Sequence, residues 1–340
     1  MSRIPLTKPL RLQNENGLRD YEIRGKPIGR GGSCLVYTAN TKEDPTVNES
    51  QNDEALARTN IIKEFYPEAL QYSIDRGKDG ALDVDDGHKD RFDELKSRFV
   101  ENYRRLVRFH NDQEASLGST IYAEAQYEAN NTSYIVMELS AGGTLDASRH
   151  WCKTLYDISS VICQLAGIVQ KYHEYEGGWL HLDLKPANVY WHKPTGDRDR
   201  FRLSLFDFDS AQRISRIQDN TDTLLYSEDW AAPELAKKDR SEIGRWTDIF
   251  SIGAIIYWLL TGDKYDIVKD GIFRRKPWNA ETLSDKLKNI DHCCVRLIEK
   301  ILGKTLRINP ANRYQRIDGE FQSDLERLRE YSGRRFFIKE

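Results

Sequence analysis

The segment His181 to Asn188, which reads HLDLKPAN, decides the fold of this chain. It follows a long helical pattern at 157–173 and precedes a short strand pattern at 189–191. Asp183 and Asn188 are five residues apart, and Lys185 lies between them. A carboxylate that accepts a hydroxyl proton, a cation that contacts a transferred phosphate and an amide that binds a metal ion are the groups that phosphoryl transfer requires. A proline-containing turn seldom carries all three, so we interpret this segment as a phosphoryl-transfer loop.

A second acidic segment follows one hairpin further along the chain. Residues 203–209 read as a strand that ends in carboxylates. Asp207, at the strand end, is well placed to bind Mg²⁺, which prefers oxygen ligands. The alternative is an ordinary turn aspartate, but the short distance in sequence from Asn188 favours a metal ligand.

Two features of the first third of the chain suggest a phosphate site. Glycines at 29, 31 and 32 lie between two expected strands within 21–37, where a glycine backbone can approach phosphates closely. No Gly-Lys-Ser/Thr follows, as a Walker loop requires, and no helix follows, as a dinucleotide fold requires. Lys63 lies in an apolar strand at 60–66, where its charge needs an anionic partner. The alternative for the glycine segment is a tight hairpin turn without a ligand. The alternative for Lys63 is a lysine at a strand edge.

The periodicity divides the chain into a strand-rich part and a helix-rich part. The first part contains the strands above, an apolar-striped helix at 90–109 and a hairpin at 120–139 that turns at Asn130-Asn131. Residues 43–59 read as a surface insertion, and 67–90 as irregular. The second part predicts helices at 157–173, 247–260, 282–290, 292–303 and 321–331. We expect an α+β chain of two lobes that join near 138–143.

Composition excludes several classes of protein. The chain has 340 residues, 39% of them hydrophobic, and a net charge of −3, so nothing marks it as a nucleic-acid binder. Its five cysteines are irregularly spaced and form no metal-ligand pattern, which is typical of a reducing compartment. The first twenty residues lack an apolar signal region, and the longest apolar run, 249–260, is too short to span a bilayer. We therefore expect a cytoplasmic protein with no membrane segment.

Together these motifs resemble the eukaryotic-type serine/threonine protein kinase family, and the resemblance runs from Tyr21 to Tyr331. The glycine-rich loop, the strand lysine, a helix, the hinge at 137–139, the 181–188 loop and Asp207-Phe208-Asp209 follow in the family's order. Ala232-Pro233-Glu234 comes next, then an apolar helix that begins near Asp248, then Arg313, which matches the arginine that pairs with the glutamate of this motif. The sequences of residues 62–67 and 128–145 are similar to those of bacterial members of the family.

The resemblance implies a small strand-rich N-lobe at 21–138 and a larger helical C-lobe at 140–331, with an N-terminal extension at 1–20 and a tail at 332–340. It implies an ATP- and Mg²⁺-dependent enzyme that transfers the γ-phosphate to a protein hydroxyl. Lys185, two residues after Asp183, and Ser227, five before Ala232, match the serine/threonine branch. The implied catalytic residues are Asp183, Lys185, Lys63 and Glu101, the nucleotide-binding residues are Ile28, Gly29, Gly31, Val36, Lys63, Met137, Glu138 and Leu139, and the metal ligands are Asn188 and Asp207.

The sequence departs from the family pattern at several positions. Leu182 replaces the arginine before the catalytic aspartate, Asp209 replaces the last glycine of Asp-Phe-Gly, and Cys34 replaces the third glycine of the loop. Glu101 has the family's spacing for the partner of Lys63, although the apolar stripe of its helix turns Asn102 inward instead. We favour Glu101.

These departures keep two alternatives open. One is a pseudokinase or nucleotide-binding scaffold with little turnover. The other, with less support, is a small-molecule phosphotransferase of the antibiotic or choline kinase type. Those enzymes lack the Ala-Pro-Glu segment, the Asp248 helix and the Arg313 anchor.

Overall fold

The structure is a computed structural model. It describes residues 3–6, 8–14, 17–42, 59–112, 123–139, 142–192, 202–219, 224–265, 268–269, 272–273 and 290–333. The chain divides into two compact units: unit 1 comprises Met1–Ala115 and Thr120–Ala141, and unit 2 comprises Ser116–Ser119 and Gly142–Glu340. The expected surface insertion at 43–59, apart from residue 59, and the expected helix at 282–290, apart from residue 290, lie outside the described residues.

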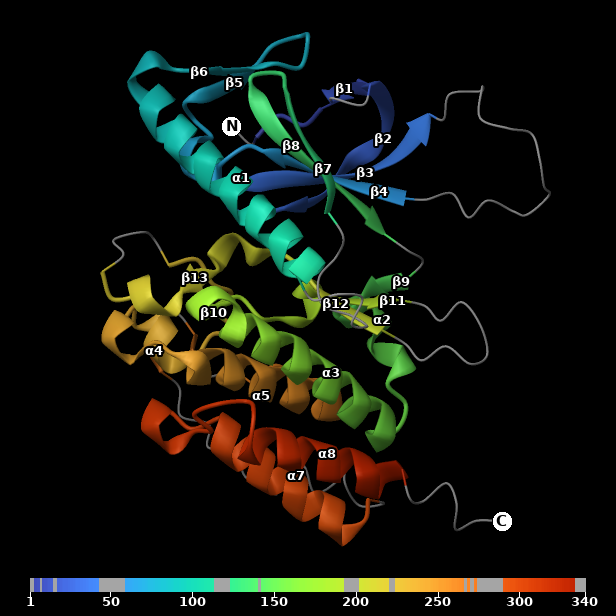
Figure 1. Cartoon of the computed structure of the whole chain (residues 1–340), viewed down its shortest axis with the longest axis vertical. Helices are drawn as coiled ribbons and strands as arrows, with labels where there is room; N and C mark the ends of the chain where they lie inside the picture. Colours follow the sequence, from blue (N-terminus) through green and yellow to red (C-terminus); the bar gives the residue numbers. More distant parts are fainter. Residues whose placement is uncertain are drawn as a thin grey trace, which may run out of the picture. The chain divides into compact units, whose positions relative to one another are not determined.

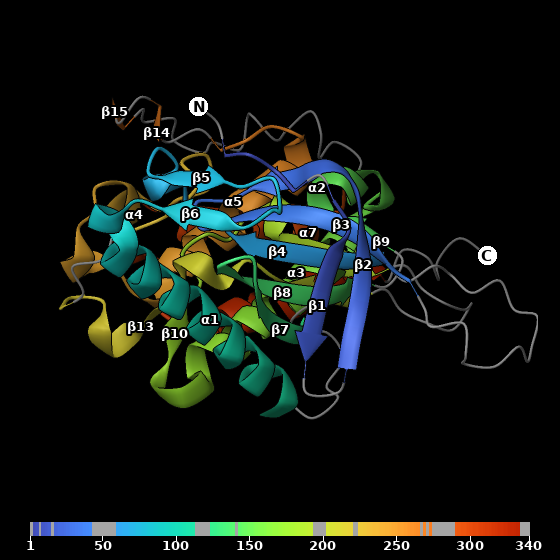
Figure 2. The ribbon, with the colours of Figure 1, turned by 90° about the horizontal axis from the view of Figure 1, so that it is seen from above.

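Unit 1 is built on a six-stranded sheet in the order β1-β2-β3-β4-β8-β7, whose described pairs are all antiparallel (Figure 2). Asn130 and Asn131 turn the β7–β8 hairpin with φ values of 52° and 59°, the left-handed conformations that a two-residue hairpin turn requires. The predicted hairpin is therefore confirmed. The strands are β1 Leu10–Asn14, β2 Gly17–Arg30, β3 Cys34–Lys42, β4 Thr59–Phe65, β7 Ala123–Ala129 and β8 Thr132–Leu139.

Residues that we expected to precede the domain contribute to this sheet. β1 pairs with β2 from Leu10 opposite Tyr21 to Asn14 opposite Gly17. Leu10 and Leu12 are buried. An edge strand of five residues has too little periodicity to be recognised against the polar residues around it.

The stretch 67–90, which we expected to be irregular, contains a second small hairpin. β5 (Ile74–Arg76) pairs with β6 (Leu82–Val84), between the short 3₁₀ helices η1 (Glu68–Leu70) and η2 (Asp86–His88). Gly80, with φ of 96°, lies in the connecting turn, which the Gly77 N–H closes by donating to the Ala81 carbonyl. Strands of three residues are too short for the alternation that predicts a strand.

Helix α1 (Lys89–Asp112) packs against β7 and β8 of the same unit (Figure 1). Of the predicted apolar stripe, Phe99 and Phe109 are buried and Leu95 and Leu106 are half-buried; Phe92, which we did not include in the stripe, is buried as well. The Phe65 ring of β4 lies 5.1 Å from the Phe92 ring and 5.4 Å from the Phe99 ring. These aromatic contacts attach α1 to the face of the sheet to which Phe65 points.

Unit 2 is mainly helical. α3 (Leu155–Glu174) packs against α5 (Arg245–Thr261) and α8 (Glu320–Gly333), and α7 (His292–Thr305) packs against α5 and α8 (Figure 1). α3 begins with a capping box in which the Thr154 and Asp157 side chains each bond to the other's backbone N–H. The remaining elements are α2 Leu145–Ser148, α4 Pro233–Ala236, β9 Gly142–Thr144, β10 Trp179–Leu180, β11 Val189–His192, β12 Arg202–Leu205, β13 Gln212–Arg213, β14 Val268–Lys269 and β15 Ile272–Phe273.

A buried ion pair joins distant parts of unit 2. The Arg313 guanidinium donates to both carboxylate oxygens of Glu234, at 2.6 and 2.8 Å, and both side chains are fully buried. The Thr247 hydroxyl adds a bond of 2.8 Å to the same carboxylate. The predicted pairing of Glu234 with Arg313 is confirmed. The pair anchors the start of α4 to the region around Arg313.

Candidate active site

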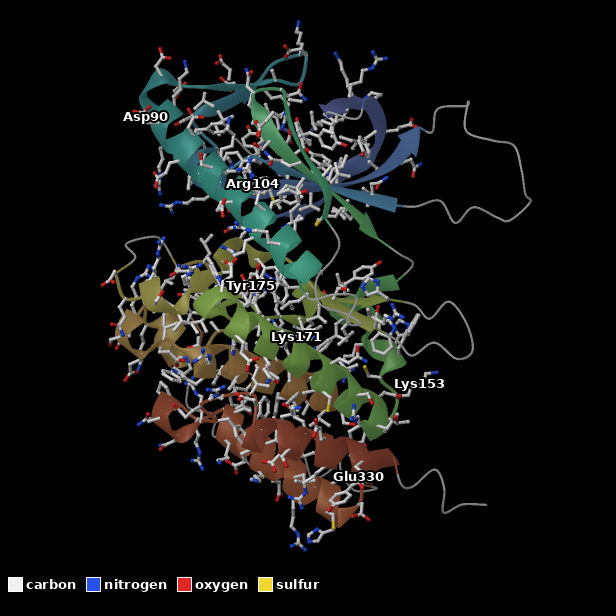
Figure 3. The ribbon with its side chains drawn as sticks, in the orientation of Figure 1. Asp90, Arg104, Lys153, Lys171, Tyr175 and Glu330 are labelled. Atoms are coloured by element: carbon white, nitrogen blue, oxygen red, sulfur yellow. The ribbon has the colours of Figure 1, made fainter. Side chains whose placement is uncertain are left out.

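The predicted phosphoryl-transfer loop follows the end of α3 in unit 2. Figure 3 labels Lys171 in the last turn of α3 and Tyr175 just after it. The chain then forms β10, the loop at 181–185, the 3₁₀ helix η5 (Pro186–Asn188) and β11. Val189 of β11 pairs with Leu205 of β12, so the hairpin brings the end of β12, and with it Asp207, close to Asn188. The Phe206 N–H donates to the Asn188 carbonyl at 3.1 Å.

Asp248, near the start of α5, holds the loop from inside the unit. One of its oxygens accepts the His181 backbone N–H at 2.9 Å, and the other accepts the Leu182 N–H at 2.9 Å. The His173 Nε2 lies 2.8 Å from the first oxygen. Burial alone would raise the pKa of Asp248, but the bonds from His173 and His181 lower it, so this carboxylate stays ionised.

These bonds also explain an unusual backbone conformation. Leu182 has a φ of 64°, in the left-handed region that costs a branched side chain about 1–2 kcal/mol. Two consecutive N–H groups at 181 and 182 reach one carboxylate only because the backbone turns here. The strain is thus offset by charge-assisted hydrogen bonds.

The Asp183 carboxylate is nine-tenths buried and only partly bonded. Its Oδ2 accepts from the Lys185 ammonium at 2.7 Å and from the Asn188 amide at 3.2 Å. The Asn188 amide also donates to the Asp183 carbonyl at 2.9 Å. Within the described residues, Asp183 Oδ1 is buried without a hydrogen-bond partner. An acceptor oxygen of this kind is suited to an incoming hydroxyl group.

Asp207 follows β12 with φ and ψ both at 62°, again left-handed. The next residues, 208–210, form the 3₁₀ helix η6, and the Phe208 ring lies 4.7 Å from the His181 ring and 4.8 Å from the Tyr172 ring. Phe208 is thus locked in the core, which fixes the position of Asp207 beside it. Asp209 is not among the residues with positive φ, so this position does not need a glycine in the observed conformation.

The buried His181 supports the loop as a neutral ring. Burial lowers the pKa of His181, although Asp248, Asp183 and Asp207 oppose the shift. Its Nδ1 lies 3.3 Å from the Asp183 N–H and its Nε2 lies 3.2 Å from the Phe206 carbonyl. A neutral ring with the proton on Nε2 satisfies both contacts.

Asn188 and Asp207 lie at adjoining ends of the β11–β12 hairpin and carry side-chain oxygens that could bind Mg²⁺. One or two such ligands together with substrate phosphates suit Mg²⁺, which seldom uses an all-protein cage. The described residues contain no cluster of three or more His, Cys, Asp or Glu side chains able to hold a metal alone.

The sequence did not predict what surrounds Leu182. Its side chain is 2% exposed and belongs to a hydrophobic cluster that joins the loop at 181–188 to the segment 212–226 and to α4. We call it the Leu182 cluster. Its members are Leu180, Leu182, Ile217, Leu224, Ala231, Leu235 and Ile243, with Ile214 and Tyr226 packed against them.

Unit 1 arranges its implied nucleotide residues in a row across the sheet. Gly29 of β2 is opposite Val36 of β3, and Val36 is opposite Lys63 of β4. Opposed residues on neighbouring strands share a face, so Val36 and Lys63 point the same way. A Cβ added at Gly29 would lie 3.4 Å from the Val36 Cβ, an ordinary van der Waals contact. Lys63 is 8% exposed.

The other implied nucleotide residues flank this row. Met137 of β8 is opposite Ile61, two residues before Lys63, and therefore lies on the same face. Glu138 and Leu139 complete β8, and their backbones pair with β4. Ile28 is 61% exposed, which suits a side chain that covers a ligand. Gly31 closes the loop turn, and its N–H donates to the Cys34 carbonyl at 3.0 Å.

The structure does not bring Glu101 to Lys63 in this conformation, so its catalytic role stays a prediction. Its side chain is 59% exposed and accepts a bond from Arg108 at 2.9 Å. The buried phenylalanines of α1, Phe92, Phe99 and Phe109, pack toward the sheet, while Asn102 is half-buried. The rotation of the helix therefore follows these apolar residues, whereas the family's spacing favoured Glu101. Lys63 is buried on the sheet, whereas Glu101 faces solvent.

Comparison with known proteins agrees with this geometry. A model of the protein kinase domain matches residues 114–315. The chain therefore belongs to the protein kinase family, as its sequence motifs indicated.

Curated relatives match only part of this chain and a small part of their own length. Ribosomal protein S6 kinase 2 alpha of Xenopus laevis is 30% identical over 138 residues, which cover 40% of this chain and 18% of that protein. Serine/threonine-protein kinase ULK1 of Homo sapiens is 34% identical over 142 residues, covering 40% and 13%. CDPK-related kinase 5 of Arabidopsis thaliana is 33% identical over 153 residues, covering 44% and 24%. The chain thus matches at most about a quarter of each of these proteins.

Solved structures share the fold over most of the chain. The apo form of PpkA-294 superposes with a TM-score of 0.58 at 21% identity, covering 91% of this chain and 95% of that one. The Mycobacterium tuberculosis PknI kinase domain gives 0.53 at 17% identity, covering 91% and 96%. No helix in the described part of the chain combines the length and apolar character that crossing a membrane requires.

Proposed function

We propose that this chain is an ATP-dependent protein kinase that phosphorylates serine or threonine side chains of proteins in the cytoplasm. The observation that carries the proposal is the state of Asp183. Its buried carboxylate has one oxygen bonded to Lys185 and Asn188 and a second oxygen without a partner among the described residues.

Each residue of the loop then has one chemical task. The free oxygen of Asp183 accepts the proton of the substrate hydroxyl as the hydroxyl oxygen bonds to the γ-phosphorus. The bond between that phosphorus and the ADP oxygen breaks, and the electron pair leaves with ADP. Lys185 offsets charge that develops on the transferred group.

The resemblance to protein kinases assigns the nucleotide contacts in this proposal. Lys63 would contact the α- and β-phosphates, and Asn188 and Asp207 would bind Mg²⁺. When bound, Mg²⁺ neutralises phosphate charge and orients the phosphates for transfer. The backbone at 138–139, with Ile28, Gly29, Gly31, Val36 and Met137 around it, would hold adenine and cover the nucleotide.

Two observations favour serine and threonine as acceptors. The Lys185 ammonium donates to the Ser227 hydroxyl at 2.8 Å as well as to Asp183, so Ser227 is fixed beside the base. The names of relatives such as serine/threonine-protein kinase ULK1 describe the same specificity for those proteins.

A scaffold with little turnover is the second candidate, because Glu101 does not face Lys63 in this conformation. Against it, the contacts of Asp183 with Lys185 and Asn188 support turnover. A small-molecule phosphotransferase is less well supported, because the buried Glu234–Arg313 pair belongs to the protein kinase pattern.

Incubation with Mg-ATP and a mixed protein substrate, followed by mass spectrometry of the modified residues, tests the proposal. We expect phosphoserine and phosphothreonine. ATP binding without turnover would support the scaffold, whereas transfer to an aminoglycoside or choline but not to protein would support the small-molecule alternative.

A further inference from the structure

The two faces of the unit 1 sheet carry different chemistry. Val36 and Lys63 point to one face, as shown above. Side chains alternate along a strand, so Tyr37 and Glu64, the next residues along β3 and β4, point to the opposite face. That face holds a buried charge, because Glu64 is fully buried.

The segment Arg3–Leu6, here called the N-terminal arm, packs on the Glu64 face. The Leu6 N–H donates to the Tyr37 hydroxyl at 3.0 Å, and Leu6 is buried. Arg76 of the β5–β6 hairpin donates to both Glu64 oxygens, at 2.9 and 2.7 Å, and its Nε donates to the Ile4 carbonyl at 2.7 Å. The arm is therefore held by a buried bond to Tyr37 and by a charge-assisted bond from Arg76, on the side of the sheet away from Lys63.

Arg3 extends from this arm to the glycine-rich loop. One nitrogen of its guanidinium donates to the Gly31 carbonyl at 2.7 Å, the Tyr66 carbonyl at 2.9 Å and the Cys34 carbonyl at 3.3 Å. Arg3 is only 4% exposed. A buried guanidinium that bonds to carbonyl groups on both sides of a loop tip restricts the loop, because moving the tip would leave a buried cation unsatisfied.

The next two carbonyls of the loop are also occupied from the same neighbourhood. The Gly32 carbonyl accepts the Glu68 N–H at 2.8 Å, and the Ser33 carbonyl accepts the Tyr66 N–H at 3.0 Å. Three successive loop carbonyls thus bond to Arg3 or to the segment 66–68, which Arg3 itself contacts.

Because the peptide bond is planar, these carbonyl contacts also fix the directions of the loop N–H groups. In a trans peptide the C=O of one residue and the N–H of the next point in opposite directions. The bonds to the Gly31 and Gly32 carbonyls therefore direct the N–H group of Gly32 away from Arg3 and that of Ser33 away from the segment 66–68, which Arg3 contacts. Successive N–H groups that point the same way form an anion-binding site.

We propose that Arg3 is a positioning residue for the nucleotide: it fixes the glycine-rich loop so that the Gly32 and Ser33 N–H groups are directed at the ATP phosphates. The inference rests on the proposed function, which supplies ATP as the ligand of this loop. Arg3 touches no substrate, because it binds the loop carbonyls from the opposite side. Arg3 contributes by preorganising the loop. Its loss therefore lowers the affinity for the nucleotide more than it lowers the affinity for the protein substrate.

Arg3→Ala tests the proposal, and Arg3→Lys keeps the cation while removing the guanidinium. The matched control is Lys8→Ala, which removes an exposed basic residue near the arm whose ammonium contacts the Lys78 carbonyl at 2.8 Å, not the glycine-rich loop. For each variant we would measure the dissociation constant of Mg-ATP, the KM for ATP and for a protein substrate, and hydrogen exchange in peptides covering 28–36.

Arg3→Ala should weaken Mg-ATP binding by about tenfold, since the loop loses its hydrogen bonds to a charged group and water replaces only part of them. The KM for ATP should rise in parallel, the KM for the protein substrate should stay within about twofold, and exchange at 28–36 should increase. Arg3→Lys should be intermediate and Lys8→Ala unchanged. These differences identify positioning, because a general loss of folded protein would lower the maximal rate and leave the KM for ATP unchanged.

Two negative results have different meanings. If the unmodified protein does not bind Mg-ATP, the proposed function fails and the inference fails with it. If the unmodified protein binds Mg-ATP but Arg3→Ala binds it within twofold, or loses no more than Lys8→Ala, only the role of Arg3 is overturned.

Discussion

The Leu182 cluster makes a prediction about the segment 212–226 that can be given a magnitude. Ile217 comes from that segment and is 2% exposed among the apolar side chains of the cluster. Ile217→Ala removes buried carbon atoms and leaves a cavity, a change that costs about 2–5 kcal/mol in protein cores. We expect this cost to fall on the attachment of the segment, because the cluster is what joins it to Leu182.

A loss of about 3 kcal/mol would raise the population of the detached segment by roughly 150-fold. The expected readouts are faster hydrogen exchange in peptides covering 212–226 and a lower rate of phosphoryl transfer. The matched control is Ile301→Ala in α7, a fully buried isoleucine outside the cluster. It should lower the melting temperature comparably while leaving the exchange of the segment and the transfer rate at 25 °C nearly unchanged.

The reasoning would be refuted if Ile217→Ala kept both its transfer rate and the exchange protection of 212–226 while its melting temperature fell. In that case the cluster would contribute to general stability only. Equal loss of activity in both variants would also contradict it, since a specific role requires a difference between them.

Three further predictions follow from the same structure. The Leu182 cluster attaches the segment by apolar contacts, in the absence of a phosphate-binding arginine before Asp183. Replacing all candidate phosphorylation sites of the segment by alanine should therefore leave the initial rate of phosphoryl transfer within about twofold. A tenfold loss, about 1.4 kcal/mol of barrier, would count against this. The sites are Ser215, Thr221 and Thr223. Arg313→Met leaves the buried Glu234 carboxylate without its cation and should lower the free energy of unfolding, measured in urea, by about 3–5 kcal/mol. A change below about 1 kcal/mol would disprove a stabilising role of the pair. Asp209→Gly should increase hydrogen exchange around Asp207, because glycine reaches conformations closed to aspartate; equal exchange would exclude that idea.

Much of the candidate site could be predicted because its residues are close together in sequence. Asp183, Lys185 and Asn188 occupy one loop, so their spacing alone defines which groups meet. The Glu234–Arg313 pair spans 79 residues, and the family resemblance was needed to predict it. The structure confirms both contacts.

Other features depend on packing that a linear pattern does not contain. Spacing favoured Glu101 as a partner of Lys63, yet the rotation of α1 follows its buried phenylalanines, and Glu101 faces solvent. The contacts of Arg3 and of Leu182 join parts of the chain that no periodicity connects. The β5–β6 hairpin is too short for its alternation to be recognised.

Substitution of Asp183 by asparagine tests the central claim most directly. Asparagine keeps the size of the side chain but removes the base, so the transfer rate should fall by about 10²–10⁴-fold. The dissociation constant of Mg-ATP should change by less than about threefold, because the phosphate contacts assigned to other residues are kept. Asp93→Asn, the same change at an exposed position of α1, is the control and should behave as the unmodified protein. An unchanged transfer rate in Asp183→Asn would contradict the account.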